Sequence, residues 1–367
     1  MSRALRSRRE RVLVGLSGGV DSAVAAVLLL EQGYQVIGVT MSVYDGPAAP
    51  SRGSACYDCG EAEDIAAASA LAGQLGIAFH VFDCAGPYRE TVIAYFRRTY
   101  LSGETPNPCV RCNPLLKFGL LPALAREKGL EHEYFATGHY ARTRLSRRFG
   151  RHVLCRGRDE RKDQSYFLYR LSREQLARAL FPLGDLTKED VRGLAASKGL
   201  PMRDTPDSQD FYAGEYAELL AVPDRPGDIV DETGAVLGRH AGFWHFTPGQ
   251  RRGLGISSAF PLYVLRVDAA RNQVVAGPYA RTLRPGCLVG DLCLHVPPEE
   301  VEGELRARVR SSQTPVPVTV RHGPDPDLLM VDFAAPQPGI APGQSLVLYQ
   351  GDLVVGGGLI RAGRVGH

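Results

Sequence analysis

The sequence predicts an α/β protein: a doubly wound parallel sheet, then a small β module, then a C-terminal β-barrel. Three observations predict this fold. Apolar runs typical of buried strands alternate with helical patterns up to about residue 140. Glycine-rich turns replace that pattern near residue 201, and short alternating strands fill the chain from about 282. The expected domains are 1–215 (catalytic), 216–281 (small, β-rich) and 282–367 (barrel).

The elements of the first domain follow in order. Gly33 and Gly76 mark the expected ends of the first two helices, because glycine commonly follows a helix C-terminus. Strands are expected at 11–16, 34–43, 77–84 and 133–139, and helices at 21–32, 61–75, 87–101, 113–128 and 163–199. Right-handed βαβ connections then bring the carboxyl ends of the strands to one edge of the sheet, where such folds bind ligands.

Composition limits the class of protein. The chain has 367 residues, of which 44% are hydrophobic and 23% charged, as in ordinary globular proteins. No apolar run is long enough for a membrane span, and the N-terminus runs into a strand without the core of a signal peptide. We therefore expect a cytoplasmic protein without a membrane partner. In that compartment its eight cysteines seldom form structural disulfides, so Cys109 and Cys112 in "TPNPCVRCN" favour metal or redox chemistry.

Arginine clusters at 3–11, 142–151 and 156–161 suit a phosphate-rich partner such as nucleic acid. The net charge is only +3. A solvated basic surface would look the same, so charge alone does not decide between the two interpretations.

Residues 17–22, "SGGVDS", lie between the first strand and the first helix. Gly18 and Gly19 let the backbone approach a phosphate, while serine hydroxyls, N–H groups and the helix N-terminus favour anions. The lysine of a Walker loop is absent. The pattern is typical of the pyrophosphate-binding loop of enzymes that split ATP into AMP and pyrophosphate. Asp21 either helps to hold Mg²⁺ or caps the helix.

Several sequence blocks, in order along nearly the whole chain, resemble those of the tRNA-specific 2-thiouridylases (the MnmA and TrmU proteins). These blocks are "GLSGGVDS", "GVTM", "GETPNPCVRCN", "KFG", "ATGHYAR", "KDQSYFLY", "HFTPGQRRGLG" and "PGQSLVLYQGDLVVGGGLI". Members of this family replace O2 of the wobble uridine of tRNA with sulfur. The resemblance implies a pyrophosphatase-loop fold and a tRNA with a wobble uridine (U34) as partner.

The resemblance also implies roles for residues. ATP would be bound by Gly15, Leu16, Ser17, Gly18, Gly19, Val20, Asp21, Ser22, Met41 and Gly138. Asn107, Pro108 and residue 109 would lie against the target base, and tRNA would also contact His139, Lys162, Asp163, Gln164 and Gln344. Cys112, Cys109 and Asp21 are the expected catalytic residues. ATP would adenylate O2 of the uracil, and sulfur from sulfide or from a persulfide carrier protein would then displace AMP.

The sequence departs from the family in its cysteines. The family's second thiol lies in a stretch resembling SQxxCF, which here reads "PDSQDFYAGEY", with Tyr212 about where that thiol belongs. Position 109, usually aspartate, is a cysteine. This exchange suggests a changed sulfur mechanism. We expect a [4Fe–4S] cluster on Cys109, Cys112 and a third cysteine, with sulfide bound to the free iron. Cys59 is favoured as that ligand because it immediately precedes a helix.

Alternatives to the cluster remain at this point. They are a persulfide relay that resolves as a Cys109–Cys112 disulfide, structural zinc, and inert buried thiols. Cys56 and Cys84 lie on the same expected sheet edge as Cys59. Two other functional classes also compete. A ligase or amidotransferase would need an ammonia source that the sequence does not show, and the intact "SGGVDS" loop argues against a non-catalytic tRNA-binding zinc scaffold.

Overall fold

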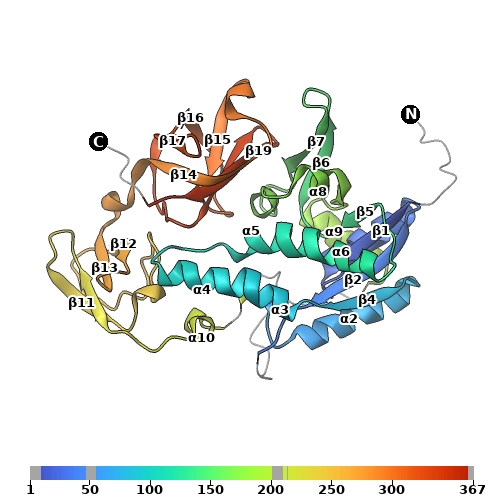
Figure 1. Ribbon diagram of the computed structural model, residues 1–367, viewed down its shortest axis with the longest axis horizontal. Helices are drawn as coiled ribbons and strands as arrows, with labels where there is room; N and C mark the ends of the chain where they lie inside the picture. The colour runs from blue at the N-terminus through green and yellow to red at the C-terminus, as the bar shows by residue number, and fades with distance from the viewer. Residues whose placement is uncertain (1–9, 47–54, 201–209, 213, 363–367) are drawn as a thin grey trace. The chain divides into compact units, whose positions relative to one another are not determined.

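The computed structural model describes residues 10–46, 55–200, 210–212 and 214–362, which form two compact units (Figure 1). The first unit comprises the chain up to Thr91 together with Cys109–Ala213, and the second comprises Val92–Pro108 together with the chain from Gly214. The expected boundaries at 215 and 281 remain predictions. Most of the arginine cluster at 3–11, and residues 206–209 and 213 of the segment around Tyr212, lie outside the described residues.

The first unit is built on a five-stranded sheet in the order β4-β2-β1-β5-β8, with every pair parallel. The strands are β1 (Arg11–Gly15), β2 (Gln35–Ser42), β4 (Phe79–Asp83), β5 (Tyr134–Ala136) and β8 (Ala179–Leu180). The doubly wound parallel sheet expected from the sequence is confirmed. Strand β8 is a correction, because it interrupts the expected helical stretch 163–199. Two residues are too few to show the alternation that identifies a strand.

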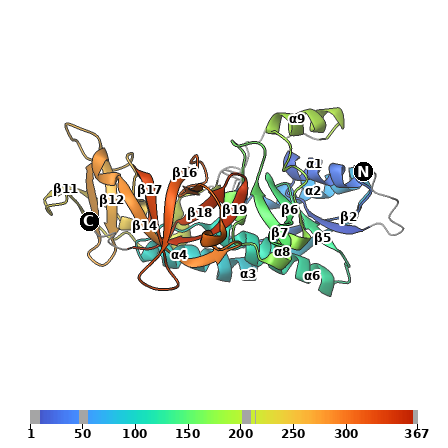
Figure 2. The ribbon, with the colours of Figure 1, turned by 90° about the horizontal axis from the view of Figure 1, so that it is seen from above.

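Helices cover both faces of this sheet. Figure 2 shows α1 (Val20–Glu31), α2 (Glu61–Leu75) and α9 (Lys188–Ser197) on one side, and α6 (Leu121–Glu127) and α8 (Arg173–Arg178) on the other. Val12 and Val14 of β1 pack in one core cluster with α1, α2 and α9. Gly33 and Gly76 have φ of 85° and 65°, the left-handed conformation expected after the ends of α1 and α2.

Shorter elements complete this unit. They are α3 (Ala85–Tyr88), α5 (Pro108–Cys112), the π-helix η2 (Asn113–Leu120), α7 (Ser165–Leu168), the parallel pair β3 (Ala55–Tyr57) and β9 (Asp210–Tyr212), and the hairpin β6 (Ala141–Ser146) and β7 (Arg151–Arg156). A π-helix, η1 (Arg89–Ile93), leads toward the second unit.

The segment 105–113, expected to be a rigid loop, is helical from Pro108 onward, and α5 continues directly into η2 and α6. Proline is well tolerated in the first turn of a helix, where its missing N–H would have no partner in any case. Cys109 and Cys112 therefore stand three residues apart on a helix, on the same side.

The second unit contains α4 (Ala94–Leu101) and α10 (Tyr216–Leu220), then two β structures. A four-stranded sheet has the order β11-β10-β13-β12, with β10 (Gly227–Val230), β11 (Val236–His240), β12 (Leu262–Asp268) and β13 (Gln273–Pro278). Six strands then form a barrel that the β14–β19 pairing closes: β14 (Arg284–Leu294), β15 (Leu305–Arg308), β16 (Val316–His322), β17 (Leu329–Gln337), β18 (Ser345–Gln350) and β19 (Leu353–Ile360).

The C-terminal barrel expected from the sequence is thus confirmed. Short 3₁₀ turns, η3 (Phe243–His245), η4 (Tyr279–Thr282) and η5 (Pro298–Glu300), lie between these strands. Within the described part of the chain, no helix has both the length and the apolar character needed to cross a bilayer.

Candidate active site

The loop 17–22 connects β1 to α1 at the carboxyl edge of the parallel sheet. The N–H of Ser17 donates to Oγ of Ser22 (3.2 Å), and that hydroxyl donates to the carbonyl of Gly19 (2.9 Å). Gly19 is the N-cap of α1 and provides no side-chain cap. The first N–H groups of α1 therefore point out of the helix end without a capping side chain, as anion binding requires.

Two glycines let neighbouring segments approach this loop closely. Gly18 has a φ of 73°, and a Cβ there would lie 2.7 Å from the carbonyl oxygen of Asp64 in α2. A Cβ on Gly138, which follows β5, would lie 2.8 Å from the backbone nitrogen of Ser22. Both positions require glycine. The predicted ATP-site residue Gly138 thus lies directly against the loop.

Asp21 does not cap α1. Both of its carboxylate oxygens accept from Nζ of Lys188 at 2.8 Å, and Oδ1 also accepts from the hydroxyl of Tyr140 (2.8 Å). The Lys188 side chain is 9% exposed and that of Asp21 is 27% exposed. Of the two roles considered for Asp21, capping is therefore wrong. Mg²⁺ would have to compete with the Lys188 ammonium for this carboxylate.

Sequence reasoning missed Lys188 and Tyr140 as members of the site. It also missed Glu61, whose carboxylate accepts from the N–H of Val43 (2.6 Å) and the hydroxyl of Ser42 (2.7 Å). Glu61 thereby fixes the chain as it leaves β2, just beyond the predicted ATP-site residue Met41. An acidic residue in the first turn of a helix is common, so nothing local marked Glu61.

The thiols lie around the start of η2. Cys112 is 7% exposed, and burial raises its pKa to about 11, although the charge of Lys117 opposes this rise. Burial opposes the charge of Lys117 itself, but Cys56, Cys112 and Cys109 outweigh it and raise the pKa of that amine. Burial and the same three cysteines raise the pKa of Tyr88. Cys56, Cys109 and Cys112 therefore share one electrostatic neighbourhood.

Strand pairing explains the place of Cys56. Strand β3 pairs with β9 so that Tyr57 lies opposite Tyr212, the position where the family's second thiol was expected. The Tyr57 ring stacks on Tyr88 (centroids 5.4 Å apart) and lies 6.3 Å from the Tyr212 ring. Tyr212 thus belongs to an aromatic stack, and Cys56 lies on the strand beside it.

The predicted third iron ligand, Cys59, has a thiol that donates to the carboxylate of Asp58 at 3.5 Å. Its role stays a prediction. Among the residues described here, no three His, Cys, Asp or Glu side chains are grouped closely enough to hold a metal ion. The cysteine sulfurs that hold a [4Fe–4S] cluster lie farther apart than the ligands of a single ion, so a cluster on Cys109, Cys112 and a third cysteine stays a prediction.

Two predicted tRNA-contacting residues, Asn107 and Gln344, lie close to one short segment of the second unit. The N–H of Thr105 donates to the carbonyl of Pro342 (2.8 Å), and the Gln344 amide donates to the carbonyl of Pro106 (3.3 Å). Asn107, 8% exposed, donates its N–H to the Tyr95 hydroxyl at 3.3 Å. Gln344 thus supports the segment that leads into α5.

The predicted contacts Asp163 and Gln164 hold their own loop together. The Asp163 carboxylate accepts from the N–H of Gly157 (3.0 Å) and of Ser165 (3.1 Å), and its side chain pairs with Arg156. Oε1 of Gln164 accepts from the N–H of Tyr140 (2.9 Å). Lys162, the third of this run, is partly exposed.

His139 lies one residue beyond Gly138, and its Nδ1 is 2.7 Å from the hydroxyl of Thr137. Its ring lies 6.3 Å from the rings of Phe118 and Phe181. Burial, with a smaller contribution from the Lys117 charge, lowers the His139 pKa to about 3. The imidazole is therefore neutral at physiological pH and available for hydrogen bonding or stacking.

Together, the parallel sheet and the anion-binding loop at its carboxyl edge define a protein of the nucleotide-binding HUP class. Family models match three consecutive segments: the tRNA methyl transferase HUP domain at residues 10–212, the tRNA methyl transferase PRC-barrel domain at 220–278, and the aminomethyltransferase β-barrel domain at 284–360.

Whole-length relatives identify the family. The tRNA-specific 2-thiouridylase MnmA of Endomicrobium trichonymphae is 43% identical over 358 residues, which is 95% of this chain and 98% of that protein. The protein of that name from Chloroflexus aurantiacus is 44% identical, with the same two coverages. The chain belongs to the family of tRNA-specific 2-thiouridylases, as its sequence blocks predicted.

Solved structures are more distant. The U34-tRNA thiolase NcsA from Methanococcus maripaludis with its [4Fe–4S] cluster overlaps 57% of this chain and 62% of its own. Its sequence identity is 18% and its TM-score is 0.35, which is too low to assign a cofactor to this chain.

We expect Lys188→Met to lower the free energy of unfolding by about 1–3 kcal/mol, because it leaves the partly buried Asp21 carboxylate without its cation. Urea unfolding should show that the double variant Asp21→Asn/Lys188→Met costs less than the sum of the two single variants. Lys198→Met is the matched control, since Lys198 pairs with Glu31 at an exposed site and should change stability by less than about 0.5 kcal/mol. Additive effects at 21 and 188 would contradict the coupling.

The lowered pKa of His139 predicts a pH effect. Below its ordinary value of 6.5 the unfolded chain binds a proton that the folded chain does not, so stability falls as pH drops from 6.5 toward 3. Between about pH 7.5 and 5 the free energy of unfolding of the wild type should fall by up to about 2 kcal/mol more than that of His139→Gln. Denaturant unfolding at both pH values measures the difference, and equal pH slopes would contradict a neutral, partly buried His139.

Proposed function

We propose that this protein is an ATP-dependent tRNA sulfurtransferase that adenylates O2 of the wobble uridine and replaces that oxygen with sulfur, giving 2-thiouridine. The observation that carries the proposal is the uncapped helix start behind loop 17–22, set at the carboxyl edge of a parallel sheet. Membership of the tRNA-specific 2-thiouridylase family supports the choice of substrate. The enzyme class follows from both.

In the first step, loop 17–22 holds the β- and γ-phosphates of ATP through its N–H groups and serine hydroxyls. O2 of the uracil attacks the α-phosphorus, an O–P bond forms, and pyrophosphate leaves. Lys188 brings a positive charge next to this loop, and Asp21 fixes its ammonium at 2.8 Å. AMP on O2 is then a good leaving group at C2.

For the second step we propose that the thiols of this chain carry the sulfur. The terminal sulfur of a persulfide on Cys112 attacks C2, and AMP leaves with the former O2. The Cys109 thiol then attacks the sulfur of Cys112, which releases the thiolated tRNA and forms a Cys109–Cys112 disulfide. A thiol reductant supplies two electrons to restore both cysteines. Their separation by three residues on one helix suits this exchange. The Lys117 charge favours the thiolate of Cys112, although burial raises the pKa of that thiol.

Cys56 is proposed as the third thiol of this chemistry, in the place of the cysteine that Tyr212 replaces. It is exposed, whereas Cys109 is half-buried and Cys112 is buried. An exposed thiol is accessible to a persulfide carrier protein, and a buried one protects the transferred sulfur from water. In the alternative, Cys109, Cys112 and a third cysteine would hold a [4Fe–4S] cluster, which would bind the sulfide.

Substitutions in the phosphate-binding loop should abolish adenylation of the tRNA and leave tRNA binding intact. Asp21→Ala and Ser17→Ala should each lower tRNA-dependent AMP release by about a hundredfold or more, because each removes charge-assisted or polar contacts next to the phosphates. Gel-shift affinity for tRNA should stay unchanged. AMP release at the wild-type rate in either variant would reject the assignment of the loop.

The cysteine variants separate the two sulfur mechanisms. Cys109→Ser and Cys112→Ser should both lose thiolation, as measured by 2-thiouridine in digested tRNA. Cys56→Ser should lose thiolation from a persulfide donor, while the neighbouring Cys59→Ser and the barrel variant Cys287→Ser should keep it. Thiolation by iron-free protein supports the relay. If iron analysis of anaerobically purified protein finds iron that activity requires, the cluster replaces the relay.

A further inference from the structure

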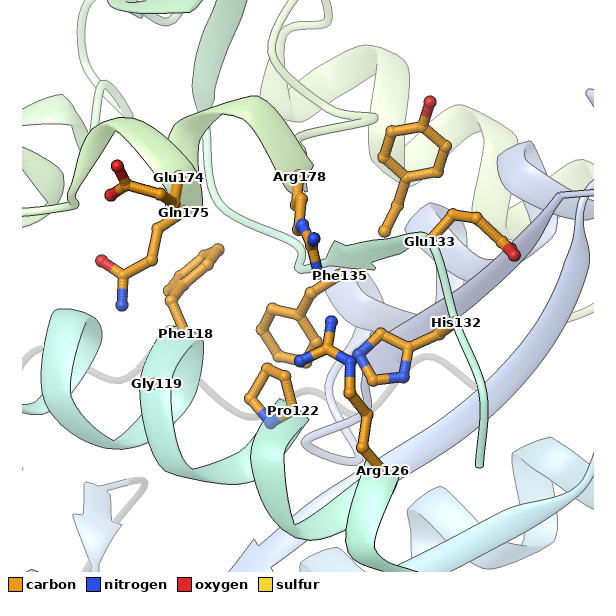
Figure 3. Close-up of a pocket in the computed structure, with 11 residues that line it drawn as sticks. Phe118, Gly119, Pro122, Arg126, His132, Glu133, Phe135, Glu174, Gln175 and Arg178 are labelled. Carbon is orange, nitrogen blue, oxygen red and sulfur yellow. The ribbon is translucent and has the colours of Figure 1, made fainter. Parts of the chain in front are cut away.

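A second polar site lies in the first unit, at the amino end of β5. A pocket of about 200 Å³ opens between η2, α6, α8 and the residues that precede β5 (Figure 3). Phe118, Pro122 and Phe135 form its apolar part, and Arg126, Arg178 and His132 form its cationic and polar part. None of these residues belongs to loop 17–22 or lies among the site cysteines Cys56, Cys109 and Cys112.

The two arginines of this pocket are not paired with its two carboxylates. The guanidinium groups of Arg126 and Arg178 point toward each other (Figure 3). Neither makes an ion pair or a side-chain hydrogen bond with any residue that the structure describes. The two carboxylates of the lining are engaged elsewhere, because Glu133 accepts from the N–H of Arg11 (2.6 Å) and Glu174 from the Ser172 hydroxyl (2.7 Å). Two like charges facing each other favour an anion between them.

His132 supplies an independent sign of a ligand. The residue is 7% exposed, and its Nδ1 donates to the carbonyl of Leu130 at 2.8 Å. Its other ring nitrogen, Nε2, is buried and has no hydrogen-bond partner. Burial lowers the pKa of His132 and the charges of Arg126 and Arg178 add to this, although the hydrogen bond to Leu130 and the charge of Glu131 oppose it. Nε2 is therefore a bare acceptor at neutral pH, and a buried acceptor needs a donor.

We propose that this pocket binds inorganic phosphate as the hydrogen phosphate ion. Two guanidinium groups match a doubly charged tetrahedral oxyanion, to which arginine binds through paired N–H groups. The P–OH group of the ion donates to Nε2 of His132. Sulfate and the phosphodiesters of RNA have no such hydrogen, and a carboxylate would balance only one arginine.

The volume agrees with a small ligand. At about 200 Å³ the pocket is below the roughly 300–1,000 Å³ of sites for drug-sized molecules. The site is independent of the proposed thiolation, so either can fail without the other.

Calorimetric titration of the full chain at about pH 8 and constant ionic strength, where His132 is neutral, tests the site. Inorganic phosphate should bind about tenfold more tightly than sulfate, since only phosphate donates to Nε2. Arg126→Gln/Arg178→Gln should weaken phosphate binding by about tenfold or more, and His132→Phe should reduce phosphate to the affinity of sulfate. Arg173→Gln, an exposed arginine of α8 outside the pocket, should change nothing.

Ser17→Ala separates this site from the ATP loop, because it should leave the phosphate affinity of the pocket intact. Equal binding of phosphate and sulfate by the wild type would overturn the proposal. So would phosphate binding that Ser17→Ala removes and Arg126→Gln/Arg178→Gln keeps. A loss of tRNA affinity in the arginine variant, without any preference for phosphate, would assign the pocket to RNA instead. Circular dichroism melting confirms that the variants are folded; both arginines are exposed, so that variant decides if His132→Phe unfolds.

Discussion

The candidate active site depends on one ion pair, between Asp21 and Lys188. Asp21 stands in the first turn of α1, immediately after the glycines of the loop, and Lys188 opens α9. The Tyr140 hydroxyl joins them from the chain that follows β5. Three segments far apart in the sequence are thereby fixed at one point of the sheet edge. Gly138 approaches Ser22 at the same point, and Gly19 leaves the first N–H groups of α1 without a side-chain cap.

Local patterns explain why much of the fold could be predicted. Short sequence patterns of a few residues indicate three of its features: strand β1, the glycine-containing loop 17–22, and the glycines that follow α1 and α2. Lys188 leaves none, because its partner is 167 positions away and its own neighbours indicate only a helix start capped by Thr187. The same limit applies to β8, because two residues are too few to show the alternating pattern of a strand. Tertiary pairing of single side chains is invisible to periodicity.

The cysteines show two limits of prediction from local sequence. The segment 105–113 is helical from Pro108 and not a loop, and the sequence did not decide which third cysteine acts with Cys109 and Cys112. Proline before Cys109 suggested a rigid loop, yet proline also begins helices, and here the helix continues through Cys112. Cys59 was favoured from its place before a helix. The pairing of β3 with β9 puts Cys56 beside the position of Tyr212, and the same thiol raises the pKa of Lys117. Strand pairing across more than 150 residues could not be inferred from either segment alone.

The cationic side chains of the first unit fall into two kinds. Lys188 is paired with a carboxylate and has a structural role, whereas Arg126 and Arg178 have no paired carboxylate among the described residues and belong to the proposed ligand site. Lys188 is almost buried and fully matched by a carboxylate, so it stabilises the loop. Arg126 and Arg178 are exposed and face each other, while the nearby carboxylates pair elsewhere. The Phe118 ring contributes to both regions of the first unit. It lines the arginine pocket, and its centroid lies 6.3 Å from that of His139, which follows β5. His132 lines the same pocket, and its buried Nε2 can accept a hydrogen bond from a ligand that carries a proton to donate.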